Sequence, residues 1–291
     1  MTARIGVVTV AYRSDEILPD FFASLDSATS EEIELVVVDN KPTGETVREM
    51  TEGRGGRYLP LPSNPGYGGA VNEGVRALSP SVEWILVSNP DIVLGPDSID
   101  RLVAAGLAAS DIGAVGPLVM TGGVPYPSAR AVPSLATGIG HALLANVRPT
   151  NRWTTRYHLG NATDGAERDA GWLSGACLLV RRSAFDQVSG FDQRYFMYFE
   201  DVDLGYRLGQ AGWRNRYAPA AVVEHSGGHS TESESAAMVE AHHRSAYRFL
   251  AGRYAHPLLL PVRIAIRIGL ALRARLATRA ARRESRFQTP T

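Results

Sequence analysis

Short apolar runs alternate with helical segments along the first part of the chain. The runs are rich in β-branched residues, which is typical of strands covered on both faces; they lie at Ile5–Val10, Ile33–Val38, Arg57–Leu59, Trp84–Val87 and Ile112–Val115. Helices are predicted between them, at Asp15–Asp26, after Pro42, at Ala70–Leu78 and at Asp97–Ala108. This alternation predicts an α/β fold with a parallel, doubly wound sheet flanked by helices.

The rhythm breaks in the second half of the chain. Residues 121–170 are rich in Gly, Pro, Ser and Thr and have no clear period, so we expect a functional loop that is mobile in the free protein. The next predicted elements are a strand, a helix and a short strand, at Gly175–Val180, Asp201–Ala211 and Ala220–Glu224. From Glu232 onward the pattern is helical. We therefore predict a main domain of residues 1–235 and a helical extension of residues 236–291.

Charge is unevenly distributed along the chain. The formal net charge is zero, which argues against a nucleic-acid partner. Lys41 is the only lysine, and eight arginines lie between Arg263 and Arg286, so the extension is basic and the main domain is net acidic. The single cysteine, Cys177, excludes an internal disulfide and a cysteine zinc site, and its apolar neighbours predict a buried free thiol.

The pattern contains no membrane span. No apolar run reaches the roughly 20 residues that a spanning helix needs, and no secretory signal precedes the first strand, so we expect a cytoplasmic protein. The segment from His256 to Leu272 combines apolar residues with spaced arginines, which favours peripheral attachment to the inner face of an anionic membrane. A helix that packs on the core or forms the seam of a homo-oligomer is the alternative.

Candidate ligand-binding residues follow the first two strands. Ligands of doubly wound sheets bind beyond the carboxyl ends of the strands. Thr9, Ala11 and Tyr12 end the first strand, and Asp39 and Asn40 end the second. A carboxylate at this place can accept hydrogen bonds from a ribose or a base, although an Asp that caps the next helix is the alternative.

A glycine-rich loop precedes the third helix. It reads Asn64-Pro-Gly66-Tyr-Gly68-Gly-Ala-Val-Asn72. Glycines let backbone amides approach a ligand closely, and the helix that follows offers its positive end to a diphosphate. The loop lacks the Gly-Lys-Ser/Thr of a Walker A motif, and no G-x-G-x-x-G follows the first strand, which disfavours a nicotinamide oxidoreductase.

Two further segments carry oxygen and nitrogen ligands. Asn89 and Asp91 leave a buried strand two residues apart, and such a pair can hold one hard cation. His225 leaves the last strand into a glycine-rich loop, where it can bind a metal or a phosphate. The alternatives are a plain Asn-Pro-Asp turn and an ordinary polar loop residue.

An acidic cluster follows an aromatic segment. Glu200, Asp201 and Asp203 lie within four residues, directly after Phe196-Met-Tyr-Phe. Carboxylates so close are costly unless some are tuned or paired, and one with a raised pKa suits a general base. A solvated helix N-terminus is the alternative, but the aromatic residues before the cluster would shield it from water.

In this order, these segments resemble the family 2 glycosyltransferases with the GT-A fold, over residues 4 to 230. The fold implied is a Rossmann-like, mostly parallel sheet flanked by helices. The quoted motifs that carry the resemblance are Thr9-Val-Ala-Tyr12, Val-Val-Val-Asp39-Asn40, Asn64-x-Gly-x-Gly with Asn72, Asn89-Pro-Asp91, Trp172-Leu-Ser-Gly-Ala176, Phe199-Glu200-Asp201-Val-Asp203-Leu and His225-Ser-Gly-Gly-x-Ser230.

The resemblance implies an inverting transfer of a sugar from a nucleotide-diphosphate donor, with Mg²⁺ or Mn²⁺ as cofactor. The Asn-Pro-Asp and Glu-Asp-Val-Asp-Leu forms are similar to rhamnosyltransferases that add L-rhamnose, from dTDP-rhamnose, to polyprenyl-diphospho-N-acetylglucosamine beneath an arabinogalactan wall. A UDP-sugar hexosyl or galactofuranosyl transferase is one alternative. A non-catalytic nucleotide-sugar sensor or scaffold is another, but it would have no use for the acid cluster.

The resemblance also implies residue roles. Asp91 would bind the metal with His225 as a supplement, because Asn89 replaces the first acid of the family's Asp-x-Asp motif. Asp201 would deprotonate the acceptor hydroxyl, and Glu200 would shape its field. Trp172 would stack on the acceptor sugar and Arg130 would meet its phosphate. The residues implied in nucleotide-sugar binding are Thr9, Ala11, Tyr12, Asp39, Asn40, Asn64, Gly66, Gly68, Asn72 and Asn89.

Overall fold

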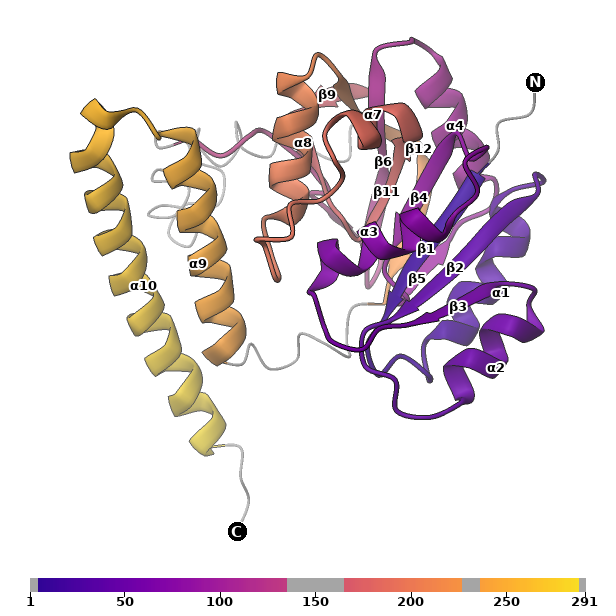
Figure 1. Ribbon diagram of the computed structural model, residues 1–291, viewed down its shortest axis with the longest axis horizontal. Coiled ribbons are helices and arrows are strands. Elements are labelled where there is room, and N and C mark those ends of the chain that lie inside the picture. Colours follow the sequence, from indigo (N-terminus) through magenta and orange to yellow (C-terminus); the bar gives the residue numbers. More distant parts are fainter. Residues whose placement is uncertain (1–4, 135–164, 227–235, 288–291) are drawn as a thin grey trace.

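A ten-stranded sheet forms the centre of the molecule (Figure 1). The computed structural model describes residues 5–134, 165–226 and 236–287. Eight strands form a continuous path in the order β3-β2-β1-β4-β11-β6-β12-β5, with β7 paired to β6 and β9 to β12. The strands of this sheet are β1 Ile5–Ala11, β2 Ile33–Asp39, β3 Arg57–Pro60, β4 Trp84–Ser88, β5 Ile92–Leu94, β6 Ile112–Thr121, β7 Val124–Tyr126, β9 Arg168–Ala170, β11 Cys177–Arg181 and β12 Arg214–His225.

Helices cover both faces of the sheet. One face packs against α1 Leu18–Ala28, α2 Thr46–Gly53 and α4 Ser98–Leu107. The other face packs against α3 Tyr67–Ala77, α7 Arg182–Gln187 and α8 Glu200–Gln210. Two apolar clusters, one on each face, form the core, because strands buried on both sides supply apolar side chains in both directions.

The first half of the chain confirms the predicted alternation, whereas the sheet is mixed rather than wholly parallel. β3, β2, β1 and β4 are parallel neighbours, but β11 runs antiparallel to β4 and to β6. The short β5 lies antiparallel to β12 and is not evident from the sequence pattern. An apolar run shows that a strand is buried but not which way it runs.

The predicted bounds miss most where strands carry polar residues or bulges. β12 begins at Arg214 rather than Ala220, because its first residues are polar and its register with β6 shifts between Ala218 and Val222. The expected loop at residues 121–170 contains strands at both described ends, β7 and β8 Ala129–Arg130 near its start and β9 at its end. β8 pairs with β10 Trp172–Leu173, which follows the loop. Residues 135–164 lie outside the described residues, so the expected mobility stays a prediction.

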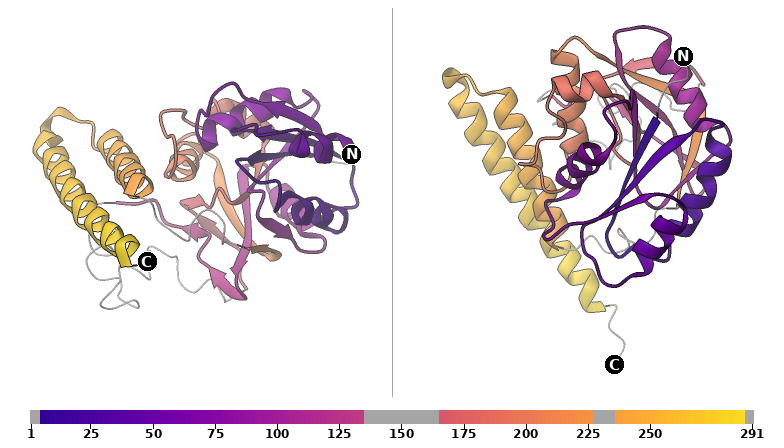
Figure 2. Two further views of the ribbon diagram at one scale, coloured as in Figure 1. Left: turned by 90° about the horizontal axis from the view of Figure 1, so that it is seen from below. Right: turned by 45° about the vertical axis from the view of Figure 1, so that its right-hand side comes forward.

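The C-terminal extension is a helical hairpin. α9 Ala236–Arg253 and α10 Leu260–Phe287 run side by side, joined through the 3-10 turn η1 Pro257–Leu259. α9 lies next to α8, and α10 lies on the side of α9 that faces away from the sheet (Figures 1 and 2). None of the helices in the described ranges is both long enough and apolar enough to cross a bilayer. Cys177 is 1% exposed, as predicted for a buried free thiol.

Candidate active site

The carboxyl ends of β1 and β2 lie side by side. Ala11 pairs in register with Asp39, and the Asp39 carboxylate accepts hydrogen bonds from the Lys41 backbone N–H and the Tyr58 hydroxyl, each at 2.9 Å. Burial and the neighbouring Asp39 raise the pKa of Tyr58 to about 12. The Thr9 hydroxyl is buried and has no hydrogen-bond partner among the described residues. Tyr58, on the neighbouring β3, is therefore a site residue that the sequence pattern did not reveal.

A cation and an aromatic ring lie next to the ends of β1 and β2. Tyr12 is 49% exposed, and the ammonium of Lys41 lies 5.6 Å from the centre of its ring. These two residues follow β1 and β2, just beyond Ala11 and Asp39. An open aromatic face beside a positive charge suits a base and a phosphate. Lys41 stood out in the sequence only as the single lysine.

The glycine-rich loop links the carboxyl end of β2 to the segment before α8. The Asn64 side chain accepts from the Gly66 N–H at 2.8 Å, and the Asn40 side-chain amide donates to the Gly66 carbonyl at 3.5 Å. Gly66 has a φ of 83°, and a Cβ there would lie 2.1 Å from the carbonyl oxygen of Phe196. A Cβ on Gly68 would lie 2.8 Å from Phe191. Close packing against these segments therefore requires both glycines.

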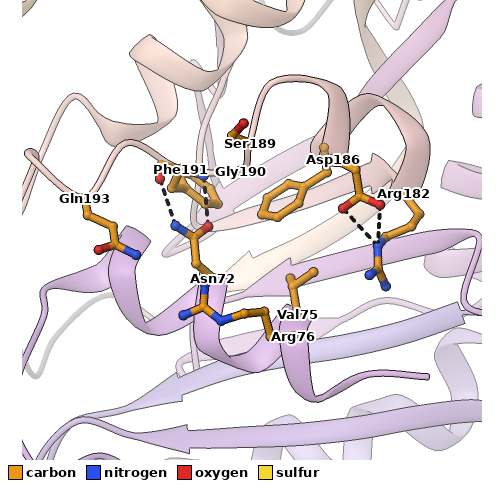
Figure 3. Close-up of a pocket in the computed structure, with 10 residues that line it drawn as sticks. Asn72, Val75, Arg76, Arg182, Asp186, Ser189, Gly190, Phe191 and Gln193 are labelled. Carbon is orange, nitrogen blue, oxygen red and sulfur yellow. Dashed lines mark hydrogen bonds and ion pairs between the residues drawn. The ribbon is translucent and has the colours of Figure 1, made fainter. Parts of the chain in front are cut away.

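Asn72 has a structural task rather than the predicted role in nucleotide binding. Its side-chain amide donates to the Phe191 carbonyl at 2.8 Å, and its side-chain oxygen accepts from the Phe191 N–H at 2.9 Å. Figure 3 shows these two hydrogen bonds, which join α3 to the segment after α7. They lie beside a cavity of about 340 Å³. Arg76, Arg182 and Asp186 also line that cavity, which contains no other predicted site residue.

The structure brings together Asp91 and His225, the two residues that the resemblance implies as metal ligands. Antiparallel pairing of β12 with β5 places His225 opposite Ile92, and His225 Nε2 lies 3.1 Å from Asp91 Oδ2. The other Asp91 oxygen, Oδ1, is buried without a partner among the described residues. Asn89 donates its backbone N–H to Ala176 at 2.8 Å, which ties this turn to the start of β11. Within the described ranges, no three His, Cys, Asp or Glu side chains gather as a metal site.

Of the three clustered acids, Glu200 and Asp201 begin α8, whereas Asp203 is held in an ion pair with Arg207. Asp203 pairs with Arg207 at 2.6 Å, and Arg207 also donates to the Val188 and Gly190 carbonyls. Asp201 accepts the Gly175 N–H at 3.0 Å on Oδ2 and the Val202 N–H at 2.8 Å on Oδ1. These contacts separate Asp203, in a structural ion pair, from the carboxylates that begin α8.

The electrostatics of Glu200 and Asp201 favour a shared proton. Glu200 is 9% exposed, and its Oε2 has no partner among the described residues. Burial, with the charge of Asp201, raises the pKa of Glu200 to about 8. Burial also raises the pKa of Asp201, against the lowering effect of its backbone donors and of Arg130. The pair can therefore hold one proton near neutral pH.

Tyr67 is hydrogen-bonded to the segment before β11. This tyrosine, at the start of α3, donates its hydroxyl to the Gly175 carbonyl at 2.7 Å. Burial raises its pKa well above 10, and the negative charges of Glu200, Asp201 and Asp91 contribute. The Tyr67 ring therefore lies within the electrostatic influence of all three carboxylates. Sequence analysis missed Tyr67, because it reads as one more residue of the glycine-rich loop.

The predicted stacking of Trp172 on an acceptor sugar is contradicted by its burial. Trp172 is 6% exposed, and its indole N–H donates to the Ala131 carbonyl at 3.1 Å. The Arg130 guanidinium lies 5.1 Å from the Trp172 ring and 5.1 Å from the ring of Tyr126. Tyr126, which is 39% exposed, has the more open ring. The positive charge of Arg130 favours the ionised form of Asp201 and so lowers its pKa.

Known proteins resemble this chain in sequence. The model of the glycosyltransferase-like family 2 matches residues 3–248. The chain is 44% identical over 274 residues to the N-acetylglucosaminyl-diphospho-decaprenol L-rhamnosyltransferase of Mycobacterium tuberculosis, covering 90% of this chain and 89% of that protein.

Two solved structures share the fold. The mannosyltransferase PcManGT from Pyrobaculum calidifontis, in complex with GDP-Man and Mn²⁺, superposes with a TM-score of 0.62 at 15% identity and covers all of this chain and 77% of its own. GalNAc-T7 with UDP, GalNAc and Mn²⁺ gives a TM-score of 0.62 at 14% identity over 92% of this chain and 54% of its own. The chain therefore belongs to glycosyltransferase family 2 and is a glycosyltransferase with the GT-A fold.

Proposed function

We propose that this enzyme transfers L-rhamnose from dTDP-rhamnose to a hydroxyl of polyprenyl-diphosphate-linked N-acetylglucosamine, with inversion at the anomeric carbon. The observation that carries this proposal is the 44% identity, over nine-tenths of both chains, to a rhamnosyltransferase named for that type of acceptor. The role of this enzyme would then be to build the linker of a cell-wall polysaccharide. The sugar, the nucleotide and the acceptor all rest on this relative.

The donor nucleotide would bind at the ends of β1 and β2. Asp39 there would hold the nucleoside, and the unpaired Thr9 hydroxyl offers a further polar contact. Tyr12 and Lys41 offer an aromatic face and the positive charge that a diphosphate requires. Asn40 would contribute through its side-chain oxygen, which is buried without a partner among the described residues.

Asp91 and His225 would hold a divalent cation, Mg²⁺ or Mn²⁺. They fit such an ion because one Asp91 oxygen is buried without a partner, while the other lies 3.1 Å from the His225 ring. A single carboxylate and an imidazole leave most positions of a hard cation to phosphate oxygens and water. When bound, the ion would neutralise charge that develops on the leaving diphosphate.

The carboxylate pair would supply the base. Asp201 would take the proton of the acceptor hydroxyl, whose oxygen then bonds to the anomeric carbon as the bond to the diphosphate breaks on the opposite face. The Gly175 and Val202 N–H groups hold Asp201 in one orientation. While the buried Glu200 is protonated, the pair carries one negative charge, on Asp201, which is then free to accept a proton.

The enzyme would work on the inner face of the plasma membrane. A polyprenyl-linked acceptor lies in a bilayer, and α10 offers a row of exposed apolar side chains with exposed arginines beside it. Such a surface binds anionic membranes without crossing them.

Donor turnover tests the proposal. Purified enzyme is incubated with Mg²⁺ or Mn²⁺ and a panel of dTDP- and UDP-sugars, with and without a lipid-diphospho-N-acetylglucosamine. We expect release of dTDP from dTDP-rhamnose, stimulated by the acceptor and abolished by EDTA. Asp91→Ala should lower kcat/KM by at least about a hundredfold, whereas Glu73→Ala, on the exposed side of α3, should not change it.

Each other outcome has a distinct meaning. Turnover of a UDP-sugar alone would retain the mechanism and replace the donor by a hexosyl or galactofuranosyl donor. Nucleotide binding without turnover of any donor would favour the non-catalytic sensor or scaffold. Full activity in EDTA would contradict the proposed use of a cation at Asp91.

A further inference from the structure

The segment that precedes the catalytic carboxylates has an unusual backbone. Residues 194–199, here called the catalytic turn, end in Tyr198 and Phe199, which have φ values of 66° and 68°. Left-handed backbone is unfavourable for aromatic residues, and it persists only where surrounding contacts impose it. Glu200 and Asp201 begin α8 directly after this pair. What holds the catalytic turn therefore also sets the position of the carboxylates.

One side of the catalytic turn is held by the donor side of the site. The Tyr67 N–H donates to the Phe196 carbonyl at 3.2 Å, and Gly66 packs too closely on Phe196 to accept a Cβ. This contact comes from the sheet domain, at the start of α3. It holds the Phe196 carbonyl, in the middle of the turn.

The other side of the catalytic turn is held by α9. The Ser245 hydroxyl donates to the Met197 carbonyl at 2.9 Å. The Phe249 ring lies 5.9 Å from the ring of Phe199, and the His242 ring lies 5.5 Å from that of Phe199. Adjacent carbonyls, those of Phe196 and Met197, are thus bonded from α3 and from α9.

The contacting residues lie on one face of α9. His242, Ser245 and Phe249 follow each other at intervals of three and four, which is the spacing of one helical face. Arg248, one position before Phe249, adds a guanidinium bond to the Arg194 carbonyl at the beginning of the turn. On another face, Arg244 pairs with Glu240 in solvent.

We propose that α9 is a positioning element of the active site, which holds Tyr198 and Phe199 in the left-handed conformation that aims Glu200 and Asp201. The Phe199 carbonyl accepts the Asp203 N–H at 2.9 Å, so the turn starts the first hydrogen bond of α8. A displacement of the Met197 carbonyl would therefore also displace Phe199 and, with it, the carboxylate of Asp201. This inference rests on the proposed base role of Asp201.

The test compares two faces of α9 in the full-length enzyme. Ser245→Ala removes the bond to Met197, and His242→Ala removes the ring beside Phe199. We expect each to lower kcat by roughly tenfold with little change in KM for the donor, since misplacing a base slows the chemical step. Backbone amides of residues 199–203 should exchange hydrogen faster. Arg244→Ala, the matched control, should change neither quantity.

A conservative variant separates positioning from loss of fold. His242→Phe keeps a ring at this exposed position and should restore both kcat and slow exchange. Unchanged exchange in Ser245→Ala and His242→Ala would overturn the inference, and so would faster exchange with unchanged kcat. Failure of the proposed base role is visible separately, because Asp201→Asn would then retain transfer while the exchange comparison still reports on α9.

Discussion

At the scale of residues, the two carboxylates that begin α8 differ in what their oxygens contact. Both oxygens of Asp201 accept backbone N–H groups, whereas one oxygen of Glu200 is buried without a partner among the described residues. Hydrogen bonds to the charged form favour ionisation, and burial without them opposes it. Asp201 is therefore the better carrier of the single charge, and Glu200 the better carrier of the proton.

This division of roles predicts a pH dependence. In the wild-type enzyme, Glu200 loses its proton at about pH 8 and adds a second charge beside Asp201. We expect an inflection near that pH in a plot of log kcat against pH. Glu200→Gln, which holds the neutral state, should retain transfer at neutral pH and lack the inflection. Asp201→Asn should lose at least about a hundredfold in kcat across the range.

Stability provides an independent reading of the same group. The folded pKa of Glu200 lies above its ordinary value of 4.5, so folding favours the protonated form. Its contribution to the free energy of unfolding is present below pH 4.5 and is lost as pH rises toward about 8. Thermal denaturation should show Glu200→Gln gaining stability relative to wild type over that interval. If the stability difference between Glu200→Gln and wild type were the same at pH 4.5 and at about pH 8, and Glu200→Gln kept the kinetic inflection, this assignment would be contradicted.

At the scale of elements, α3 joins the glycine-rich loop to Gly175 and to the catalytic turn. Its first residue, Tyr67, contacts Gly175 and the catalytic turn, and Asn72 bonds to Phe191 one turn further on. Gly74 packs against Val8 so closely that a Cβ would lie 2.4 Å from its side chain. The helix is therefore built for close packing on the sheet, which fixes the two ends of the site relative to each other.

Asn72→Ala tests the structural role of this side chain. The substitution leaves the buried Phe191 N–H and carbonyl without their partners, so we expect a loss of about 2–4 kcal/mol in the free energy of unfolding. Urea denaturation would measure it, with Glu73→Ala as a surface control that changes stability by under about 0.5 kcal/mol. If Asn72 instead bound the nucleotide, the variant would weaken donor binding at nearly unchanged stability.

At the scale of the whole molecule, the extension has an inner and an outer side. α9 faces the catalytic turn, and α10 covers α9 from outside (Figure 2). On α10, apolar residues at intervals of four are each at least half exposed, namely Leu260 51%, Ile264 50%, Ile268 55% and Leu272 54%. Arg267 and Arg275 are exposed beside this row. The described part of the molecule leaves this row uncovered, and this is the surface that we propose for membrane contact.

Vesicle binding tests this assignment. We expect wild-type protein to co-sediment with phosphatidylglycerol vesicles and much less with phosphatidylcholine. Replacing Ile264, Ile268 and Leu272 together by glutamine should weaken binding by at least about tenfold, because the apolar contact area is lost. Leu107→Gln, at a 59% exposed site on α4, is the matched control. If the triple variant co-sediments with vesicles as well as the wild type does, and the wild type is a dimer in solution, the row would instead be the seam of a homo-oligomer.

The sequence by itself determined the elements and the local chemistry. Periodicity located β1, β2, β4 and the helices between them, because burial of a strand or a helix face depends on residues close together in the chain. Placing the ligand site beyond the strand ends then singled out Asp39 and Asp91, and the acidic cluster after the aromatic segment singled out Asp201. The resemblance to a known family, rather than the pattern, implied that His225 supplements Asp91.

Only the tertiary structure decided which distant segments meet. The direction of β11, the hydroxyl of Tyr58 on Asp39, the covering of Trp172 by Arg130 and the contact of Ser245 with Met197 all join residues far apart in the chain. No periodic pattern encodes such contacts, since they depend on strand pairing and on how helices pack across the sheet. For that reason Asn72, which sequence analysis assigned to the nucleotide, instead fastens α3 to Phe191.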